Sequence, residues 1–284
     1  MRSRRPASQV ALAVALALTV LLGSWAVATW PSAARPGVTA AVETGPQPVL
    51  FHPSRYRAAS ASTSVDSIVV LGDSVATGAG CSCRPFDTLF AHQVRQVSGQ
   101  GVVLSSYPHD GLTSAGLQQQ LYDDDGAQRA VSKATTVTVT IGANDFDAAQ
   151  ADSGCSGAGT SCFDNDLAAL PGHLRAILSR IHALAGSQVR VLVTGYWNVF
   201  LDGQVASQRG RTYTSTSDAL TRKVNAAIKS TTEAAGATYV DVYTAFRGDG
   251  DQDDTSLLAS DGDHPSQAGH QLIAHLLEHA LLGR

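Results

Sequence analysis

The chain has 284 residues, of which 44% are hydrophobic and 15% are charged. This composition supplies enough apolar side chains for a packed core and excludes a wholly disordered chain. Lys and Arg number 20 against 24 Asp and Glu, which gives a formal net charge of −4. Domains that bind nucleic acid are usually far more basic, so we expect a globular protein with no nucleic-acid partner.

Residues 1–28 have the pattern of an export signal. Arg2, Arg4 and Arg5 precede an apolar run from Val10 to Ala28, which ends on the small residues Ala26-Val27-Ala28. The run also approaches the roughly 20 residues that span a bilayer, so an uncleaved membrane anchor is the alternative. In both cases the rest of the chain lies outside the cytoplasm, either secreted or tethered to the membrane.

Residues 29–64 are predicted to be a disordered linker. They contain five of the ten prolines, mixed with Ala, Ser, Thr and Gly, and they show no apolar periodicity. Such a segment buries too little apolar surface to offset its chain entropy. We therefore expect one folded domain, over residues 65–284.

From residue 65 onward, short β-branched runs alternate with segments of helical periodicity. Five runs have the composition of buried strands: Ile68–Leu71, Val102–Leu104, Thr135–Ile141, Val189–Val193 and Tyr239–Val242. Helical patterns cover 164–185, 217–235 and 265–282. The alternation predicts a three-layer α/β/α fold around a five-stranded parallel sheet. In such sheets the functional residues lie at the carboxyl ends of the strands.

Three of the predicted strand ends carry residues that could take part in catalysis. The first strand leads into Gly72-Asp73-Ser74, where glycine permits a sharp turn that presents Ser74. The second leads to Gly111, whose backbone N–H lies next to a helix start, and the third leads to Asn144, whose amide can donate to an oxyanion. Each feature is also typical of an ordinary polar turn, so none identifies a site alone.

A histidine with an acidic neighbour follows the last predicted strand. In Asp261-Gly262-Asp263-His264-Pro265 the carboxylate of Asp261 is near enough in the chain to orient the His264 imidazole. His109, after the second strand, is the alternative base. Together with the three strand ends, His264 and Asp261 complete a set of nucleophile, base, orienting carboxylate and oxyanion donors.

This ordered set resembles the GDSL family, also called SGNH hydrolases, which are secreted serine esterases and lipases of flavodoxin-like fold. The four characteristic residues of that family match Ser74, Gly111, Asn144 and His264. They stand within the strings Gly-Asp-Ser, Gly-x-Thr-Ser, Gly-x-Asn-Asp and Asp-x-x-His-Pro, and the resemblance covers about residues 66–282. The first string continues with Val in place of the usual Leu.

The resemblance implies a carboxylic ester hydrolase that forms an acyl-enzyme. Ser74 would attack the ester carbonyl, His264 would act as general base, and Asp261 would hold the imidazole. The backbone N–H groups of Ser74 and Gly111, with the amide of Asn144, would bind the oxyanion. An acyltransferase that uses the same acyl-enzyme and a catalytically inactive binding module on the same fold are the alternatives.

The expected substrate is a small-molecule, lipid or acylated-sugar ester, and we expect a monomer. Tyr196 and Trp197 follow the fourth predicted strand and are candidates for substrate binding, although aromatic side chains pack into cores at least as often. No metal or organic cofactor is expected.

Other enzyme classes fit the sequence less well. An α/β-hydrolase needs Gly-x-Ser-x-Gly, which no serine of the chain satisfies. The string His275-x-x-Glu278-His279 spells an inverted zinc-protease motif, but its side chains should face water on the last helix. The acidic loop 249–254 resembles the start of a calcium loop without its glycine and final acid.

Four cysteines in an exported chain suggest two disulfides with three possible pairings. We favour a local bridge between Cys155 and Cys162, because Gly157 and Gly159 let the chain turn back between them. Cys81 and Cys83 would then pair with each other or remain free thiols, and a bridge between the two groups is the alternative.

Overall fold

The computed structural model describes residues 64–148 and 159–283. The predicted export signal, residues 1–28, and residues 29–63 of the predicted linker lie outside the described residues. Within the described part of the chain, every helix is too short or too polar to cross a bilayer.

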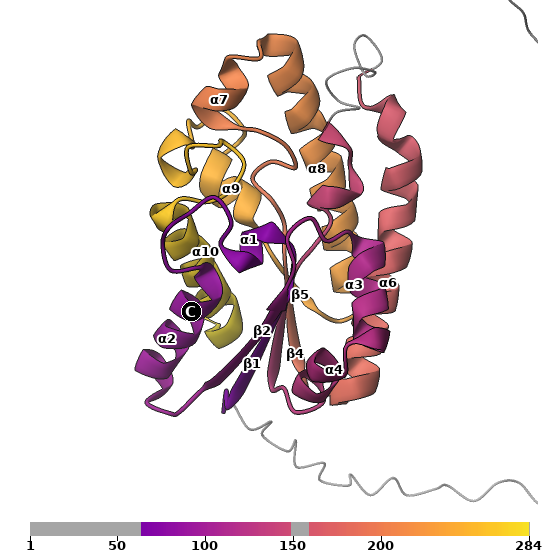
Figure 1. Cartoon of the computed structure of the whole chain (residues 1–284), viewed down its shortest axis with the longest axis vertical. Coiled ribbons are helices and arrows are strands. Elements are labelled where there is room, and N and C mark those ends of the chain that lie inside the picture. The colour runs from indigo at the N-terminus through magenta and orange to yellow at the C-terminus, as the bar shows by residue number, and fades with distance from the viewer. Residues whose placement is uncertain (1–63, 149–158, 284) are drawn as a thin grey trace, which may run out of the picture. The chain divides into compact units, whose positions relative to one another are not determined.

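A parallel sheet forms the centre of the fold (Figure 1). Its five strands follow the order β2-β1-β3-β4-β5, and all four neighbouring pairs are parallel. The strands are β1 (Ser67–Gly72), β2 (Val103–Pro108), β3 (Thr136–Thr140), β4 (Arg190–Thr194) and β5 (Thr238–Val240). The predicted five-stranded parallel sheet is therefore confirmed.

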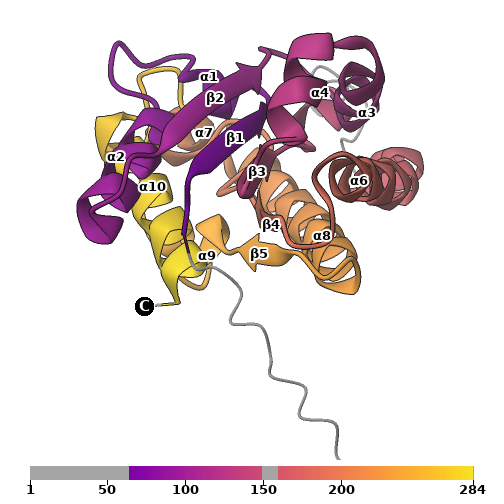
Figure 2. The same cartoon turned by 90° about the horizontal axis from the view of Figure 1, so that it is seen from below.

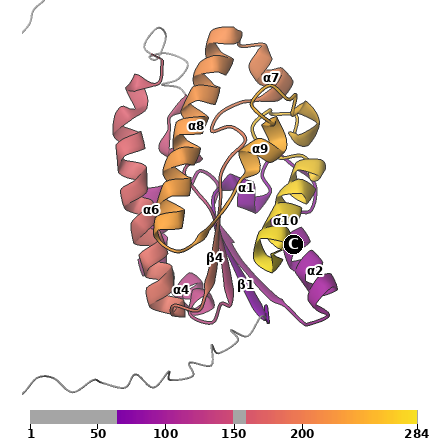
Figure 3. The ribbon, with the colours of Figure 1, turned by 180° about the vertical axis from the view of Figure 1, so that it is seen from behind.

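Helices cover both faces of the sheet, as seen from below in Figure 2 and from behind in Figure 3. One face carries α2 (Phe86–Ser98), α9 (Val242–Arg247) and α10 (Gln267–Leu282). The other face carries α3 (Ser114–Asp123), α4 (Asp125–Val131), α6 (Asp164–Ala185) and α8 (Arg211–Ala234). The remaining helices within the described residues are short: α1 (Ser74–Thr77), α7 (Gly203–Ser207) and the 3₁₀ turns Ala143–Asp145, Ser161–Phe163 and Thr255–Leu257.

The central strands are buried because helices pack on both of their faces. All five residues of β3 are buried, including its alternate threonines, whereas the edge strand β2 leaves Val103 62% exposed. The long helix α6 turns a single apolar stripe inward: Leu170, Leu174, Ile177, Leu178 and Ile181. Burying each such side chain contributes about 1.5–3 kcal/mol, so this stripe fixes the helix against the sheet.

Two helix starts differ from the predicted ones. Helix α8 begins at Arg211. The predicted start at 217 is too late, because the first turns of the helix are polar and lack the apolar periodicity on which the prediction depends. They are held instead by Tyr213, whose hydroxyl accepts a hydrogen bond from the backbone N–H of Leu201. Helix α10 begins at Gln267, capped by the Ser266 side chain, while Pro265 pairs with a neighbouring loop rather than opening the helix.

The strand register brings the chemically interesting segments to one edge of the sheet. Gly72, the last residue of β1, is level with Pro108 of β2 and with Thr140 of β3. The chain leaves β1 toward β2 and then returns to the other side of β1 as β3, so β1 and β3 flank a topological switch point. Ligands of open α/β sheets bind in the crevice at such a point.

Candidate active site

Ser74 is the first residue of α1 and is half-buried at the end of β1. The turn that presents it depends on Gly72, whose φ is +150° and whose side chain, if it had one, would place Cβ 2.3 Å from the carbonyl oxygen of Thr140. Asp73 caps α1, since its Oδ1 accepts the backbone N–H of Val75 at 3.0 Å. The local sequence therefore fixes where the Ser74 hydroxyl stands.

Asp73 is itself held by Tyr196, which is distant in the sequence. It is 1% exposed, and its Oδ2 accepts a hydrogen bond from the hydroxyl of Tyr196, which is equally buried. Burial raises the pKa of Asp73 to about 7, against the lowering effect of the bonds from Tyr196 and Val75. Burial likewise raises the pKa of Tyr196 well above its ordinary value.

His264 and Asp261 form a hydrogen-bonded pair in the loop before α10. The Nδ1 atom of His264 lies 2.8 Å from Asp261 Oδ2, and Asp261 Oδ1 accepts the backbone N–H groups of Asp263 and His264 at 3.0 Å each. Burial raises the pKa of Asp261, but these hydrogen bonds outweigh it and hold the pKa below its ordinary value. The carboxylate therefore stays ionised and fixes the orientation of the imidazole.

The two predicted oxyanion segments are joined to each other. Asn144 is exposed in the 3₁₀ turn after β3, and its Nδ2 donates to the carbonyl oxygen of Leu112 at 3.2 Å. Leu112 follows Gly111, which is exposed and has a φ of +71°. The next residue after Asn144, Asp145, accepts the backbone N–H of Ser114 at 2.8 Å and so ties this turn to the start of α3.

Ser74, Asn144 and His264 line a single cavity with a volume of about 40 Å³. The structure therefore brings together three residues that lie far apart in the sequence. Asp261 and Gly111 are not among the lining residues, and Asp261 contacts the cavity only through His264. His109, the alternative base, is also not among them.

Tyr196 and Trp197 line the same cavity, but each is only 1% exposed. The Tyr196 hydroxyl is engaged with Asp73, and Trp197 stacks on Phe246 with ring centroids 4.9 Å apart. Both side chains thus build the floor of the site, and their contact with substrate stays a prediction.

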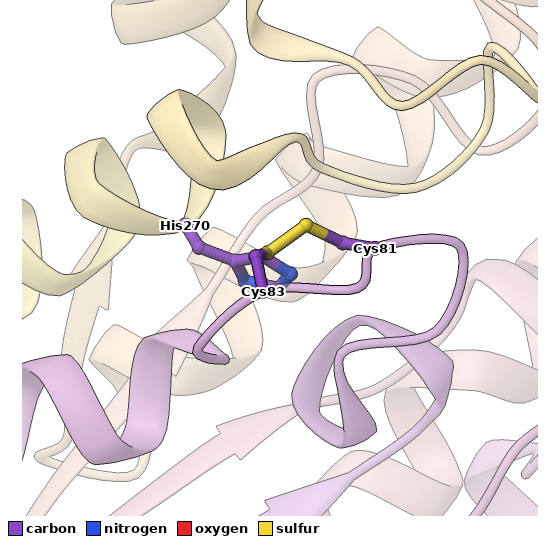
Figure 4. A group of neighbouring side chains, drawn as sticks. All are labelled: Cys81, Cys83 and His270. Carbon is purple, nitrogen blue, oxygen red and sulfur yellow. A yellow bond between two sulfur atoms is a disulfide. The ribbon is translucent and has the colours of Figure 1, made fainter.

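The loop between α1 and α2 packs against the His264–Asp261 pair. A Cβ atom on Gly80 would lie 2.4 Å from Asp261 Oδ2 and 2.8 Å from His264 Cβ. The next residues carry Cys81 and Cys83, whose sulfur atoms lie at bonding distance beside His270 (Figure 4). Cys155 lies outside the described residues, so its predicted bridge to Cys162 stays a prediction.

The acidic loop lies apart from this site. It borders a cavity of about 590 Å³ that contains neither Ser74 nor His264. Its innermost residue, Asp254, is buried near Asp202, and Arg247 forms an ion pair with Asp202.

The cluster of His275, Glu278 and His279 on α10 was predicted to face water as a whole. His275 is exposed, but Glu278 is only 5% exposed, because that turn of α10 packs inward.

Three parts of the site are not visible in the sequence pattern. They are the Tyr196–Asp73 bond, the close approach of Gly80 to the His264–Asp261 pair, and the position of His270 beside the cysteines. Each is a contact between segments that lie far apart in the sequence. The positive φ of Gly80 is the one local signal, because a glycine in a tight loop often marks a close approach.

Comparison with known proteins gives the same fold. The model of the GDSL-like lipase/acylhydrolase family matches residues 70–272. The lipase Lip_vut3 from a goat rumen metagenome superposes with a TM-score of 0.61 at 19% identity, covering 76% of this chain and 97% of that one. Phospholipase A1 from Streptomyces albidoflavus superposes with a TM-score of 0.57 at 21% identity, covering 76% and 100%.

An acetylxylan esterase from Geobacillus stearothermophilus gives a TM-score of 0.54 at 17% identity, covering 76% of this chain and 94% of that one. No curated protein matches the sequence.

Proposed function

The chain belongs to the GDSL-like lipase/acylhydrolase family and is a carboxylic ester hydrolase, and we propose that it acts through Ser74, His264 and Asp261. One observation carries this proposal: His264 Nδ1 lies 2.8 Å from Asp261 Oδ2, and His264 and Ser74 line the same cavity. A nucleophile, a base and a group that orients the base are the parts that acyl transfer to serine requires.

In the proposed mechanism, Ser74 Oγ attacks the ester carbonyl while His264 takes its proton. Because Nδ1 of His264 is held by Asp261, Nε2 is the nitrogen left for the serine proton. The ionised Asp261 stabilises the imidazolium that forms. His264 then gives the proton to the leaving alcohol, and water releases the acid by the reverse sequence.

The oxyanion is bound by the N–H groups of Ser74 and Gly111 and by the Asn144 amide. Support for this comes from the Asn144–Leu112 bond, which joins the Asn144 turn to the segment of Gly111. Donors held in place before the reaction need little reorganisation as negative charge develops on the carbonyl oxygen.

The size of the cavity supports a short acyl group. About 40 Å³ beside Ser74 is space for roughly three water-sized groups, because a water needs about 10–15 Å³ by the same measure. An acetyl group has three non-hydrogen atoms and fits that space. We therefore propose acetate and similar short-chain esters of small molecules as the preferred substrates, ahead of long-chain lipids.

The proposal places the enzyme outside the cytoplasm, on the strength of the basic and apolar pattern of residues 1–28. A solved relative of the same fold, from Streptomyces rimosus, is described as an extracellular lipase; it is 21% identical, covers 76% of this chain and 100% of that one, and has a TM-score of 0.54.

A panel of p-nitrophenyl esters from acetate to palmitate tests both parts of the proposal. We expect the highest kcat/KM with acetate, and a loss of about 10³-fold or more in Ser74→Ala at an unchanged circular dichroism spectrum. Equal rates in Ser74→Ala and wild type would contradict the catalytic assignment. A preference for palmitate would contradict only the short acyl group.

A further inference from the structure

The cysteine pair in the loop after α1 is partly exposed to solvent. Cys81 and Cys83 are both half-buried, and Ser82 between them is exposed. Their Cα atoms are 5.2 Å apart. A bridge across one intervening residue closes a very short loop and therefore restricts the unfolded chain little. We therefore expect the bridge to contribute little to stability and, at two half-buried residues, to be accessible to a soluble thiol.

His270 lies directly behind this pair, as Figure 4 shows. It belongs to the first turns of α10, and its side chain is fully buried. One ring nitrogen and the two Sγ atoms all lie within 4.8 Å of one another. A buried imidazole edge against two sulfur atoms is the central feature of this cluster.

The hydrogen bonding of His270 fixes its tautomer. Its Nδ1 accepts the backbone N–H of Phe86 at 3.2 Å. Burial lowers the pKa of His270 to about 4, so the ring is neutral near pH 7 and carries its proton on Nε2. Nε2 has no hydrogen-bond partner among the described residues. A buried N–H donor is thus left without an acceptor.

This tautomer argues against a metal site in the cluster and favours stabilisation of a cysteine thiolate. A metal ion would need the Nε2 lone pair, which the proton occupies while Nδ1 accepts from Phe86. A thiolate, in contrast, needs a donor. A disulfide sulfur is a weak acceptor, whereas a thiolate accepts strongly, so the reduced pair would satisfy His270 and the oxidised pair does not.

The cysteine loop also contacts the catalytic residues. Gly80, next to Cys81, leaves no room for a side chain between the main chain and the pair of Asp261 and His264. A change in the Cys81–Cys83 bridge therefore acts on the main chain that packs against this pair.

We propose that Cys81 and Cys83 form a redox-active disulfide that exchanges with dithiols, that the Nε2–H of His270 stabilises the reduced form, and that the state of the bridge controls how Gly80 packs against Asp261 and His264. The reductant is a dithiol of the Cys-x-x-Cys class. This inference goes beyond ester hydrolysis, and its redox part does not depend on the proposed catalytic residues.

The exchange runs in two balanced steps. A thiolate of the dithiol attacks one Sγ, the bond between the two cysteines breaks, and a mixed disulfide forms while the other cysteine leaves as thiolate. The second thiol of the dithiol then attacks the dithiol-derived sulfur of the mixed disulfide. The dithiol becomes a disulfide, and the first cysteine is released. Two electrons pass to Cys81 and Cys83, the two protons come from the dithiol, and the dithiol leaves as a disulfide.

The test is a redox titration of the full chain with dithiothreitol. Differential alkylation and mass spectrometry of the tryptic peptide 58–95, which runs through Arg84 because trypsin does not cleave before Pro85, report this pair separately from the other cysteines. We expect His270→Phe to shift the equilibrium about tenfold or more toward the disulfide, because the donor is lost. His270→Gln, which restores an N–H donor, and His275→Gln, an exposed control on the same helix, should stay within about threefold of wild type.

A shift below about threefold in His270→Phe would overturn the role of His270. If His270→Phe does not fold, the Nε2–H signal of ¹⁵N-labelled histidine in the wild type decides. It should move downfield when dithiothreitol is added, and an unmoved signal would overturn the proposal.

The link to catalysis has its own readout. Reduction should lower kcat in the wild type and leave it unchanged in the Cys81→Ser/Cys83→Ser variant. Equal kcat before and after reduction of the wild type would overturn the control of the active site. Absence of any esterase activity would instead contradict the proposed function, while the redox titration still stands.

Discussion

The hydroxyl of Tyr196 donates a hydrogen bond to the carboxyl group of Asp73, the residue directly before Ser74. The two residues are 123 positions apart in the chain, one after β4 and the other after β1. Asp73 uses its other oxygen to cap the helix that Ser74 begins. The position of Ser74, the proposed nucleophile, therefore depends on a buried contact that spans the sheet.

Removing this contact should affect both stability and rate. Tyr196→Phe leaves a buried carboxyl oxygen of Asp73 without its donor, which should cost about 1–3 kcal/mol of unfolding free energy. We expect kcat to fall more than KM rises, since Ser74 loses its fixed position rather than a substrate contact. Urea unfolding and ester kinetics measure the two effects. Tyr122→Phe, at a residue 55% exposed, is the control, and equal stability of both variants would contradict this role.

The raised pKa of Asp73 predicts how stability varies with pH. Its pKa in the folded protein, about 7, lies above the ordinary value of 3.8, so the folded state keeps a proton that the unfolded chain releases. The unfolding free energy should therefore fall as pH rises from about 4 to 7, by up to about 4 kcal/mol from this group, and then level off.

Asp73→Asn should remove most of this fall, because asparagine does not ionise; its oxygen can still accept the N–H of Val75 while its NH2 group donates to the Tyr196 hydroxyl oxygen. Urea midpoints between pH 5 and 8 measure the difference. Asp125→Asn, at a side chain 84% exposed, should follow the wild type. Parallel curves for Asp73→Asn and wild type would show that Asp73 is not the titrating group.

Gly80→Ala tests the packing of the cysteine loop on Asp261 and His264, the proposed catalytic pair. The new Cβ would stand 2.4 Å from Asp261 Oδ2, so Asp261 and His264 must move and kcat should fall about 10²-fold. Gly99→Ala is a matched control: its φ of +65° is close to the +73° of Gly80, but nothing lies within 4 Å of the added Cβ. Both variants carry the strain of a side chain at positive φ, but only Gly80→Ala adds the overlap, so an equal effect on kcat would exclude a specific contact.

Asn144→Ala should lower kcat about 10²–10³-fold with little change in KM, because the hydrogen bond from the Asn144 amide to the oxyanion strengthens only as charge develops. Asn144 is exposed, so the unfolding free energy should hardly change. Asn144→Asp, of the same shape, should be slower still because its charge repels the oxyanion. A pure KM effect in both variants would make Asn144 a substrate-binding residue instead.

Much of this architecture could be predicted from local pattern. Buried strands such as β1 are runs of apolar residues, and the positions of Ser74, Asn144 and His264 follow once parallel strands are assumed to end at one edge. The start of α8 could not be predicted, because polar residues form its first turns and a tertiary contact of Tyr213 holds them.

The remaining parts of the site depend on contacts between segments that lie far apart in the sequence. Nothing near Tyr196 indicates that its hydroxyl reaches Asp73, and nothing near Cys81 indicates that His270 lies behind it. Their apolar and polar patterns are those of ordinary core and loop residues, so only the folded arrangement reveals them.

The most direct test of the central claim, that Ser74 is the nucleophile, is the position of a covalent adduct. The wild-type protein is treated with a fluorophosphonate, which phosphonylates an activated serine, and the modified residue is located by tandem mass spectrometry. We expect a single adduct on Ser74, absent in Ser74→Ala and formed at least about 10²-fold more slowly in His264→Gln. An adduct on another serine, or an unmodified Ser74 in an enzyme that the reagent inactivates, would contradict it.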